Sequence, residues 1–216
     1  MGARDRVAAA TLEPARTNSD STSDALGVRQ NARLTAVTGF LLLLLLGAEL
    51  VTALGIDGLI GPHLEIGAAL LAPVALKLGT TGWKIGRYYG GAPDYVRAGP
   101  PSLLRRLLAP VVIVTTVGLL GTGTALMVLG PANAGHLAFF HRAFFAVWCA
   151  ALALHVLIHV LRSARAVSAE VSAHRARPLP GRSQRARALA FTVAVGLGLA
   201  AWAAQHVAPW ASALHH

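Results

Sequence analysis

The chain has 216 residues, of which 55% are hydrophobic and 13% are charged. That charged fraction is about half the ~25% of a soluble globular domain, which excludes a disordered chain, a coiled coil and most water-soluble enzymes. A single cysteine excludes a disulfide framework, a cysteine-rich metal site and haem attached through a C-x-x-C-H motif, and the net charge is +10. The composition therefore predicts an integral membrane protein.

In chain order, residues 1–33 come first; they are polar, show no apolar period and are expected to form a disordered cytoplasmic tail. After them come five stretches that are apolar over roughly 20 residues, the length that a helix needs to cross a hydrocarbon core of ~30 Å. These stretches are predicted to be membrane-spanning helices at residues 34–56, 63–83, 107–129, 137–161 and 188–208. The fold class is therefore an all-α membrane bundle over residues 34–210, followed by a short extracytoplasmic tail at residues 211–216.

The basic residues are sorted between the loops. Of the 19 Lys and Arg residues, 17 lie in the N-terminal tail or in the connections after the second and the fourth helix. The other two connections and the C-terminal tail carry none. By the positive-inside rule the N-terminus is cytoplasmic and the C-terminus lies outside. This sorting explains the net charge without nucleic acid, so we expect a multi-pass protein of the plasma membrane in contact with lipid.

Two of the predicted helices repeat one spacing of polar residues. His63 and Lys77 are 14 residues apart in the second helix, and His141 and His155 are 14 residues apart in the fourth. Fourteen residues make nearly four helical turns, about 21 Å, so each pair lies on roughly one face at two depths. Both helices run from the outside to the inside. We therefore expect His63 and His141 to share a depth near the outer face, and Lys77 and His155 to share a deeper one.

Histidines at one depth on two helices are the arrangement that holds a six-coordinate haem b, because the iron takes one imidazole nitrogen from each helix. Gly67, one turn after His63, would let the flat ring approach the helix. Arg142 could pair with haem propionates, since guanidinium–carboxylate pairs are bidentate and strong. The sequence therefore predicts one haem b with His63 and His141 as the iron ligands. Packing or interfacial histidines, and an Arg142 that faces the outer headgroups, remain the alternatives.

Other ionisable residues inside the spans have several interpretations. Glu49 and Glu65 are expected to be hydrogen-bonded carboxyls packed against a neighbouring helix, with a proton relay as the alternative. Lys77 can extend its ammonium toward the cytoplasmic face. It can also pair with a carboxylate or a propionate inside the bundle, or ligate iron when it is deprotonated.

Residues 34–162 resemble the four-helix membrane cytochromes b, including the di-haem respiratory type, in which two helices each carry histidines 14 residues apart. The chain is also similar to a group of largely uncharacterised actinobacterial multi-pass proteins at Ala75–Gly79, Arg87–Tyr89, Gly99–Pro101 and Leu107–Pro110. By position, the resemblance implies that His63 and His141 ligate an outer haem and that His155 is one ligand of an inner haem. Lys77 departs from the pattern because it stands where the second inner histidine would be, so a second haem stays open.

The expected function is that of a b-type cytochrome-like subunit that passes single electrons between a quinone or cytoplasmic donor and an extracytoplasmic redox partner. The sequence contains no nucleotide fingerprint, nucleophile arrangement or separate soluble domain, so catalysis would belong to a partner. The alternative is a haem-free membrane scaffold or assembly protein. A proton-coupled transporter is disfavoured by the odd number of spans and by the lack of inverted repeats.

Overall fold

The computed structural model describes residues 3–97, 103–172 and 182–214, and within these ranges the chain is helical apart from short turns. The Gly99–Pro101 segment of the sequence pattern lies outside the described residues. The long helices are α1 (Ala3–Leu54), α2 (Ile56–Tyr89), α4 (Leu103–Leu129), α5 (Gly135–Ser172) and α6 (Arg182–Ala204). The short ones are α3 (Pro93–Arg97), the 3₁₀ helix η1 (Pro131–Asn133) and α7 (Val207–Leu214).

The five long helices are long and apolar enough to cross a membrane, which confirms the all-α, five-span fold class. Their apolar segments are Gln30–Leu54, Ile56–Tyr89, Arg106–Leu129, Gly135–Leu157 and Arg182–Ala204, and each overlaps one predicted span. Large apolar side chains on the outer surface, such as Leu107, Leu157 and Phe191, are mostly exposed, as expected of groups that face lipid. The chain thus has the architecture of a multi-pass membrane protein.

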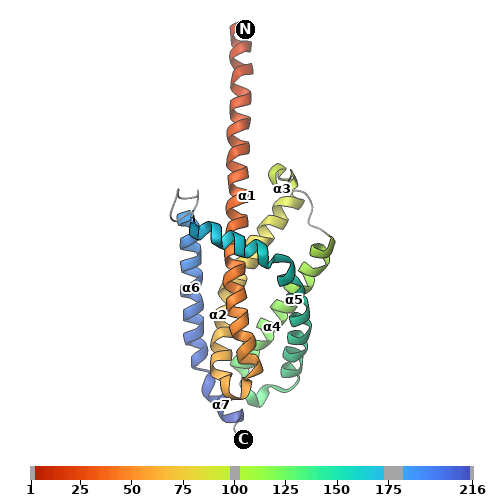
Figure 1. Ribbon diagram of the computed structural model, residues 1–216, viewed down its shortest axis with the longest axis vertical. Helices are drawn as coiled ribbons and strands as arrows, with labels where there is room; N and C mark the ends of the chain where they lie inside the picture. The colour runs from red at the N-terminus through yellow and green to blue at the C-terminus, as the bar shows by residue number, and fades with distance from the viewer. Residues whose placement is uncertain (1–2, 98–102, 173–181, 215–216) are drawn as a thin grey trace.

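The two ends of the chain differ from the sequence-based expectation. The sequence predicts a disordered tail over residues 1–33, but α1 continues as one helix from Ala3 and extends well beyond the rest of the bundle (Figure 1). Residues that precede an already formed span can join its helix without nucleating a new one. At the other end, the chain turns at Gln205 and His206 and forms α7, which packs against α2, where the sequence predicts the end of a span and a tail.

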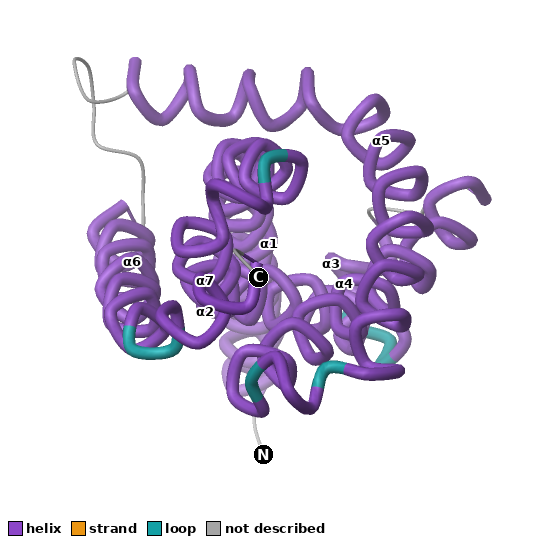
Figure 2. Tube along the Cα trace, turned by 90° about the horizontal axis from the view of Figure 1, so that it is seen from below, coloured by secondary structure: helices purple, strands orange, loops and turns teal. Residues whose placement is uncertain are grey.

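The helix α2 lies at the centre of the packing. It contacts α1 on one side and α6 on another, while α4 pairs with α5 and α5 also contacts α1 (Figure 2). Leu42, Leu70 and Val74 form a buried cluster where α1 and α2 meet. The contact with α6 is close because Gly196 has no side chain: a Cβ there would lie 3.1 Å from the Ala69 carbonyl oxygen. Small residues of this kind let membrane helices approach one another.

The ends of the molecule agree with the sorting of basic residues. The N-terminus and the C-terminus lie at opposite ends of the bundle, and α3 and the start of α6 lie toward the N-terminal end (Figure 1). The last part of α5 leaves the bundle axis and lies across it, which leads the chain toward α6 (Figure 1). Of the basic connections, the described parts α3 and the start of α6 therefore lie toward one end of the molecule.

This arrangement generates a topology prediction. Reporter proteins fused at Gly58, beside the α1–α2 turn, and at the C-terminus should report an extracytoplasmic location. Fusions at Ala92 and at Ser172 should report the cytoplasm, because the basic connections stay inside. Paired alkaline phosphatase and fluorescent-protein fusions measure both sides. A cytoplasmic C-terminus would contradict five spans and the parallel direction of α2 and α5.

Candidate functional site

The rings of His63 in α2 and His141 in α5 meet inside the bundle. Their centroids are 6.4 Å apart, and the ring planes are at 79° to each other. Both side chains are partly buried in helices whose outer surfaces are apolar. The structure therefore brings together the two histidines that the 14-residue repeat places at one depth.

The local fold of α2 brings His63 to face α1. The chain leaves α1 at Leu54 and turns through Gly55 into α2. One turn later the helix is interrupted at Leu59, whose φ and ψ of −122° and 21° are not helical, and Pro62 follows directly before His63. Proline has no N–H to donate and its ring clashes with the preceding turn, so a bend at this place is expected.

A glutamate of α1 contacts the His63 ring. Glu49 Oε1 lies 3.1 Å from His63 Nδ1, and the two side chains are 17% and 19% exposed. Thr52, one turn after Glu49, lies with its Oγ1 3.1 Å from Glu49 Oε2 and 3.4 Å from His63 Nδ1. A Cβ at Gly67 would lie 3.1 Å from Glu49 Oε1. Gly67, which the sequence predicts to make room for a flat ring, thus makes room for the Glu49 carboxylate.

The partner of His141 is a hydroxyl of α4. Thr122 Oγ1 lies 3.0 Å from His141 Nδ1, and it donates its own proton to the Gly118 carbonyl at 2.7 Å. The hydroxyl oxygen can therefore accept a hydrogen bond from the Nδ1–H of His141. A Cβ at Gly123 would lie 3.0 Å from His141 Cε1, so that position keeps α4 close to the ring.

The contacts of both rings with Glu49, Thr52 and Thr122 use Nδ1. A neutral imidazole that donates from Nδ1 carries its lone pair on Nε2. Nε2 is therefore the candidate metal ligand on His63 and on His141. Among the residues that the structure describes, no group of three or more His, Cys, Asp or Glu is placed to hold a metal ion.

A cavity of about 1580 Å³ runs along the bundle beside the pair. It exceeds the volume of about 300–1,000 Å³ that is usual for small-molecule sites. Its walls are mostly apolar and come mainly from α1, α2, α4 and α5. All the candidate site residues line it, namely His63, Gly67, Lys77, His141, Arg142 and His155. Arg142 is exposed beside the histidine pair, so both of its interpretations stay open.

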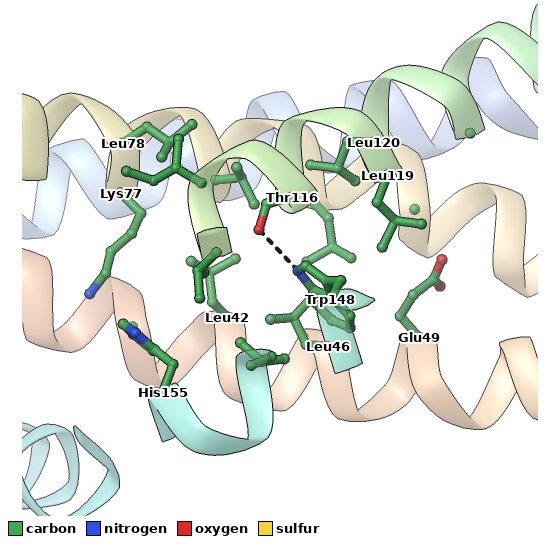
Figure 3. Close-up of a pocket in the computed structure, with 18 of the residues that line it drawn as sticks. Leu42, Leu46, Glu49, Lys77, Leu78, Thr116, Leu119, Leu120, Trp148 and His155 are labelled. Atoms are coloured by element: carbon green, nitrogen blue, oxygen red, sulfur yellow. Dashed lines mark hydrogen bonds between the residues drawn. The ribbon is translucent and has the colours of Figure 1, made fainter. Parts of the chain in front are cut away.

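The deeper level of the cavity differs from the outer one. Lys77 and His155 lie at one end of the pocket in Figure 3, Glu49 lies at the other, and Trp148 lies between them. The indole of Trp148 donates to Thr116 at 2.9 Å, which ties α5 to α4. Lys77 Nζ donates to the backbone carbonyl of Thr35 in α1 at 2.5 Å. Lys77 thus has an internal partner, although that partner is a carbonyl and not the carboxylate or propionate that the sequence suggests.

Sequence reasoning missed the groups that hold the two rings. Glu49 is the hydrogen-bonded carboxyl packed against a neighbouring helix that the sequence predicts, but its contact with His63 is not predicted. The roles of Thr52 and Thr122 are also missed. Thr52 lies three residues after Glu49 and therefore on the same helix face. This spacing is the sequence signal that could have predicted their contact.

Comparisons with known proteins leave the function open. No protein-family model matches the chain, and neither the curated proteins nor the solved structures include a significant match. The function must therefore be argued from the geometry of the site.

The packing of α4 on His141 gives a prediction for two glycines of one helix. Gly123→Leu would push its side chain into the His141 ring, while Gly121→Leu enters open space, because a Cβ at Gly121 meets nothing within 4 Å. Overpacking of this kind typically costs about 1–3 kcal/mol. Thermal unfolding of the purified protein in detergent should show a lower midpoint for Gly123→Leu only. Equal midpoints in both variants would contradict the contact.

Proposed function

We propose that the chain binds one haem b between His63 and His141 and acts as a membrane electron-transfer subunit. The separation of the two rings carries the proposal. A metal–imidazole bond is about 2 Å long and the ring centre lies about 1 Å behind the nitrogen, so imidazoles on opposite sides of one metal have centroids about 6 Å apart. The observed centroid distance is 6.4 Å.

The surroundings of the rings also support the proposal. Histidines that bind a metal usually donate their other ring N–H to a carboxylate, a carbonyl or another acceptor, which fixes the tautomer. Glu49 Oε1 at 3.1 Å from His63 Nδ1 and Thr122 Oγ1 at 3.0 Å from His141 Nδ1 are such acceptors. A porphyrin supplies four nitrogen ligands of its own, so two imidazoles complete the coordination. The cavity beside the pair has the volume for a large planar group.

The residues of this chain would then have distinct roles. When bound, a haem supplies one-electron chemistry. His63 and His141 would hold it from two helices, and the apolar walls of the cavity would exclude water. Arg142, exposed beside the pair, would bind its propionates.

The proposed topology gives the membrane face on which a redox partner would exchange electrons with the haem. With basic connections inside, the histidine pair would lie toward the extracytoplasmic face of the plasma membrane. Electrons would pass from a quinone or a cytoplasmic donor to a redox partner outside, and catalysis would belong to that partner. We propose a single haem, because at the deeper level Lys77 donates to the Thr35 carbonyl and no second imidazole faces His155 from α2.

A haem-free scaffold remains the second candidate, and one observation favours it. The polar groups of the site already satisfy one another, since Glu49 and Thr122 each bond a ring and the two rings meet edge to face. Such a cluster could serve only to lock four helices together, because hydrogen bonds across membrane helices stabilise their association.

The ligand assignment predicts the effect of removing either histidine. His63→Ala and His141→Ala should each abolish haem binding and still insert into the membrane, since the loss of an imidazole makes each helix more apolar. His136→Ala, an exposed histidine at the start of α5, is the control and should keep the haem. Haem is quantified as its pyridine complex against the protein concentration. A colourless, folded wild type would instead support the scaffold.

The stoichiometry depends on Lys77. Lys77→His would place an imidazole in α2 at the level of His155, and the ratio of haem to protein should rise from about one toward two. Loss of the ammonium also removes a cation that costs about 2.5–3.5 kcal/mol at the centre of a membrane helix. A wild-type ratio already near two would contradict the single-haem proposal. A ratio that stays near one in the variant would show that the deeper level cannot take a haem.

A further inference from the structure

We propose that Glu49 is a positioning residue that, together with Thr52, holds the His63 ring in one plane and one tautomer, nearly perpendicular to the His141 ring that Thr122 holds. This inference rests on the proposed function, because it concerns how the two ligands would face one haem. It assigns a role to three side chains that touch the rings and not the haem itself.

The contacts around Glu49 fix the position of its side chain. Its two carboxylate oxygens have separate partners: Oε1 lies 3.1 Å from His63 Nδ1, and Oε2 accepts a hydrogen bond from Thr52 Oγ1 at 3.1 Å. The single hydroxyl proton of Thr52 is shared between Oε2 and the Glu49 carbonyl oxygen, which lies 2.8 Å from Oγ1 and ties Thr52 to its own helix. Gly67 leaves the space in α2 that Oε1 occupies. The carboxylate is therefore fixed from α1 and fitted into α2.

The two rings are held by different chemistry. The partner of His63 is a carboxylate of α1, whereas the partner of His141 is the hydroxyl of Thr122 in α4. A carboxylate partner makes an imidazole a more basic ligand, and a hydroxyl does so less. We therefore expect the His63–Glu49 pair to stabilise ferric iron more than the His141–Thr122 pair does.

The orientation of the rings has a spectroscopic consequence. Each Nδ1 contact fixes the rotation of one ring, and together they leave the planes at 79°. In a low-spin ferric haem, nearly perpendicular imidazole planes leave the iron d orbitals close in energy and give a highly anisotropic electron paramagnetic resonance signal. Parallel planes split these orbitals more and give a less anisotropic signal. The wild type should therefore show the highly anisotropic form.

Variants at Glu49 separate orientation from charge. Glu49→Leu removes the acceptor of the His63 Nδ1–H, so the signal should change shape and the affinity for haem should fall about 10–100-fold, as is typical for the loss of such a partner. Glu49→Gln keeps an oxygen acceptor and removes the carboxylate charge. This variant should keep the wild-type signal while its midpoint potential rises. A tenfold loss of affinity confined to the ferric form corresponds to about 59 mV.

Two further variants make the test independent of the folding of Glu49→Leu. Gly67→Ala keeps Glu49 but moves its carboxylate by a few tenths of an ångström, because the added Cβ would lie 3.1 Å from Oε1. This variant should shift the signal in the same direction as Glu49→Leu but by less. Glu65→Gln is the matched control. Glu65 is another partly buried glutamate, two residues from His63, that does not line the cavity, so its signal, potential and affinity should equal those of the wild type.

The outcomes separate this inference from the proposed function. A wild type that binds haem, with signal, potential and affinity unchanged in Glu49→Leu, Glu49→Gln and Gly67→Ala, would overturn the role of Glu49 and leave the haem assignment intact. The same changes in Glu65→Gln would also overturn it, since they would show an unspecific response. A wild type without haem would refute both proposals.

Discussion

A strongly polar side chain inside a bilayer must find a partner within the protein, and the centre of this bundle is organised by that constraint. Glu49 of α1 contacts His63 of α2, and Thr122 of α4 contacts His141 of α5. The two rings then meet across the remaining gap. Each of the four helices thus contributes to the cluster, which joins the α1–α2 pair to the α4–α5 pair. The haem proposal and the scaffold alternative both depend on this cluster.

The polar cluster in turn depends on glycine residues, which leave space for its side chains and for close helix contacts. Gly67 admits the Glu49 carboxylate into α2, and Gly123 lets α4 approach His141. Gly196 brings α6 within contact of the α2 backbone at Ala69, six residues after His63. In a membrane, close approach of this kind replaces the hydrophobic driving force that packs soluble proteins, because lipid tails are as apolar as the helices. Close approach at glycine and hydrogen bonding therefore act together in this part of the bundle.

The sequence could predict those features that depend on distance along a single helix. Apolar length gave the five spans, and the equal 14-residue intervals placed His63 level with His141. It could not predict which helices would be neighbours, so the contacts of Glu49 and Thr122 with the rings were missed, and Gly67 was assigned to a flat cofactor when its space holds the carboxylate. Composition also did not predict that α1 begins at Ala3 or that α7 packs against α2.

The 14-residue repeat places equivalent positions of α2 and α5 at two levels of the cavity. The side chains at these two levels differ in their hydrogen-bonding chemistry. At the outer level the acceptors Glu49 and Thr122 leave both imidazoles able to present a lone pair. At the deeper level Lys77 is a donor and is already bonded to the Thr35 carbonyl. An ammonium has three donors and no acceptor, so it cannot bind a metal in that state. One substitution in a repeated pattern thus makes the cavity asymmetric along its length. A bound redox group would then lie toward one face of the membrane, which favours exchange with a partner on that face.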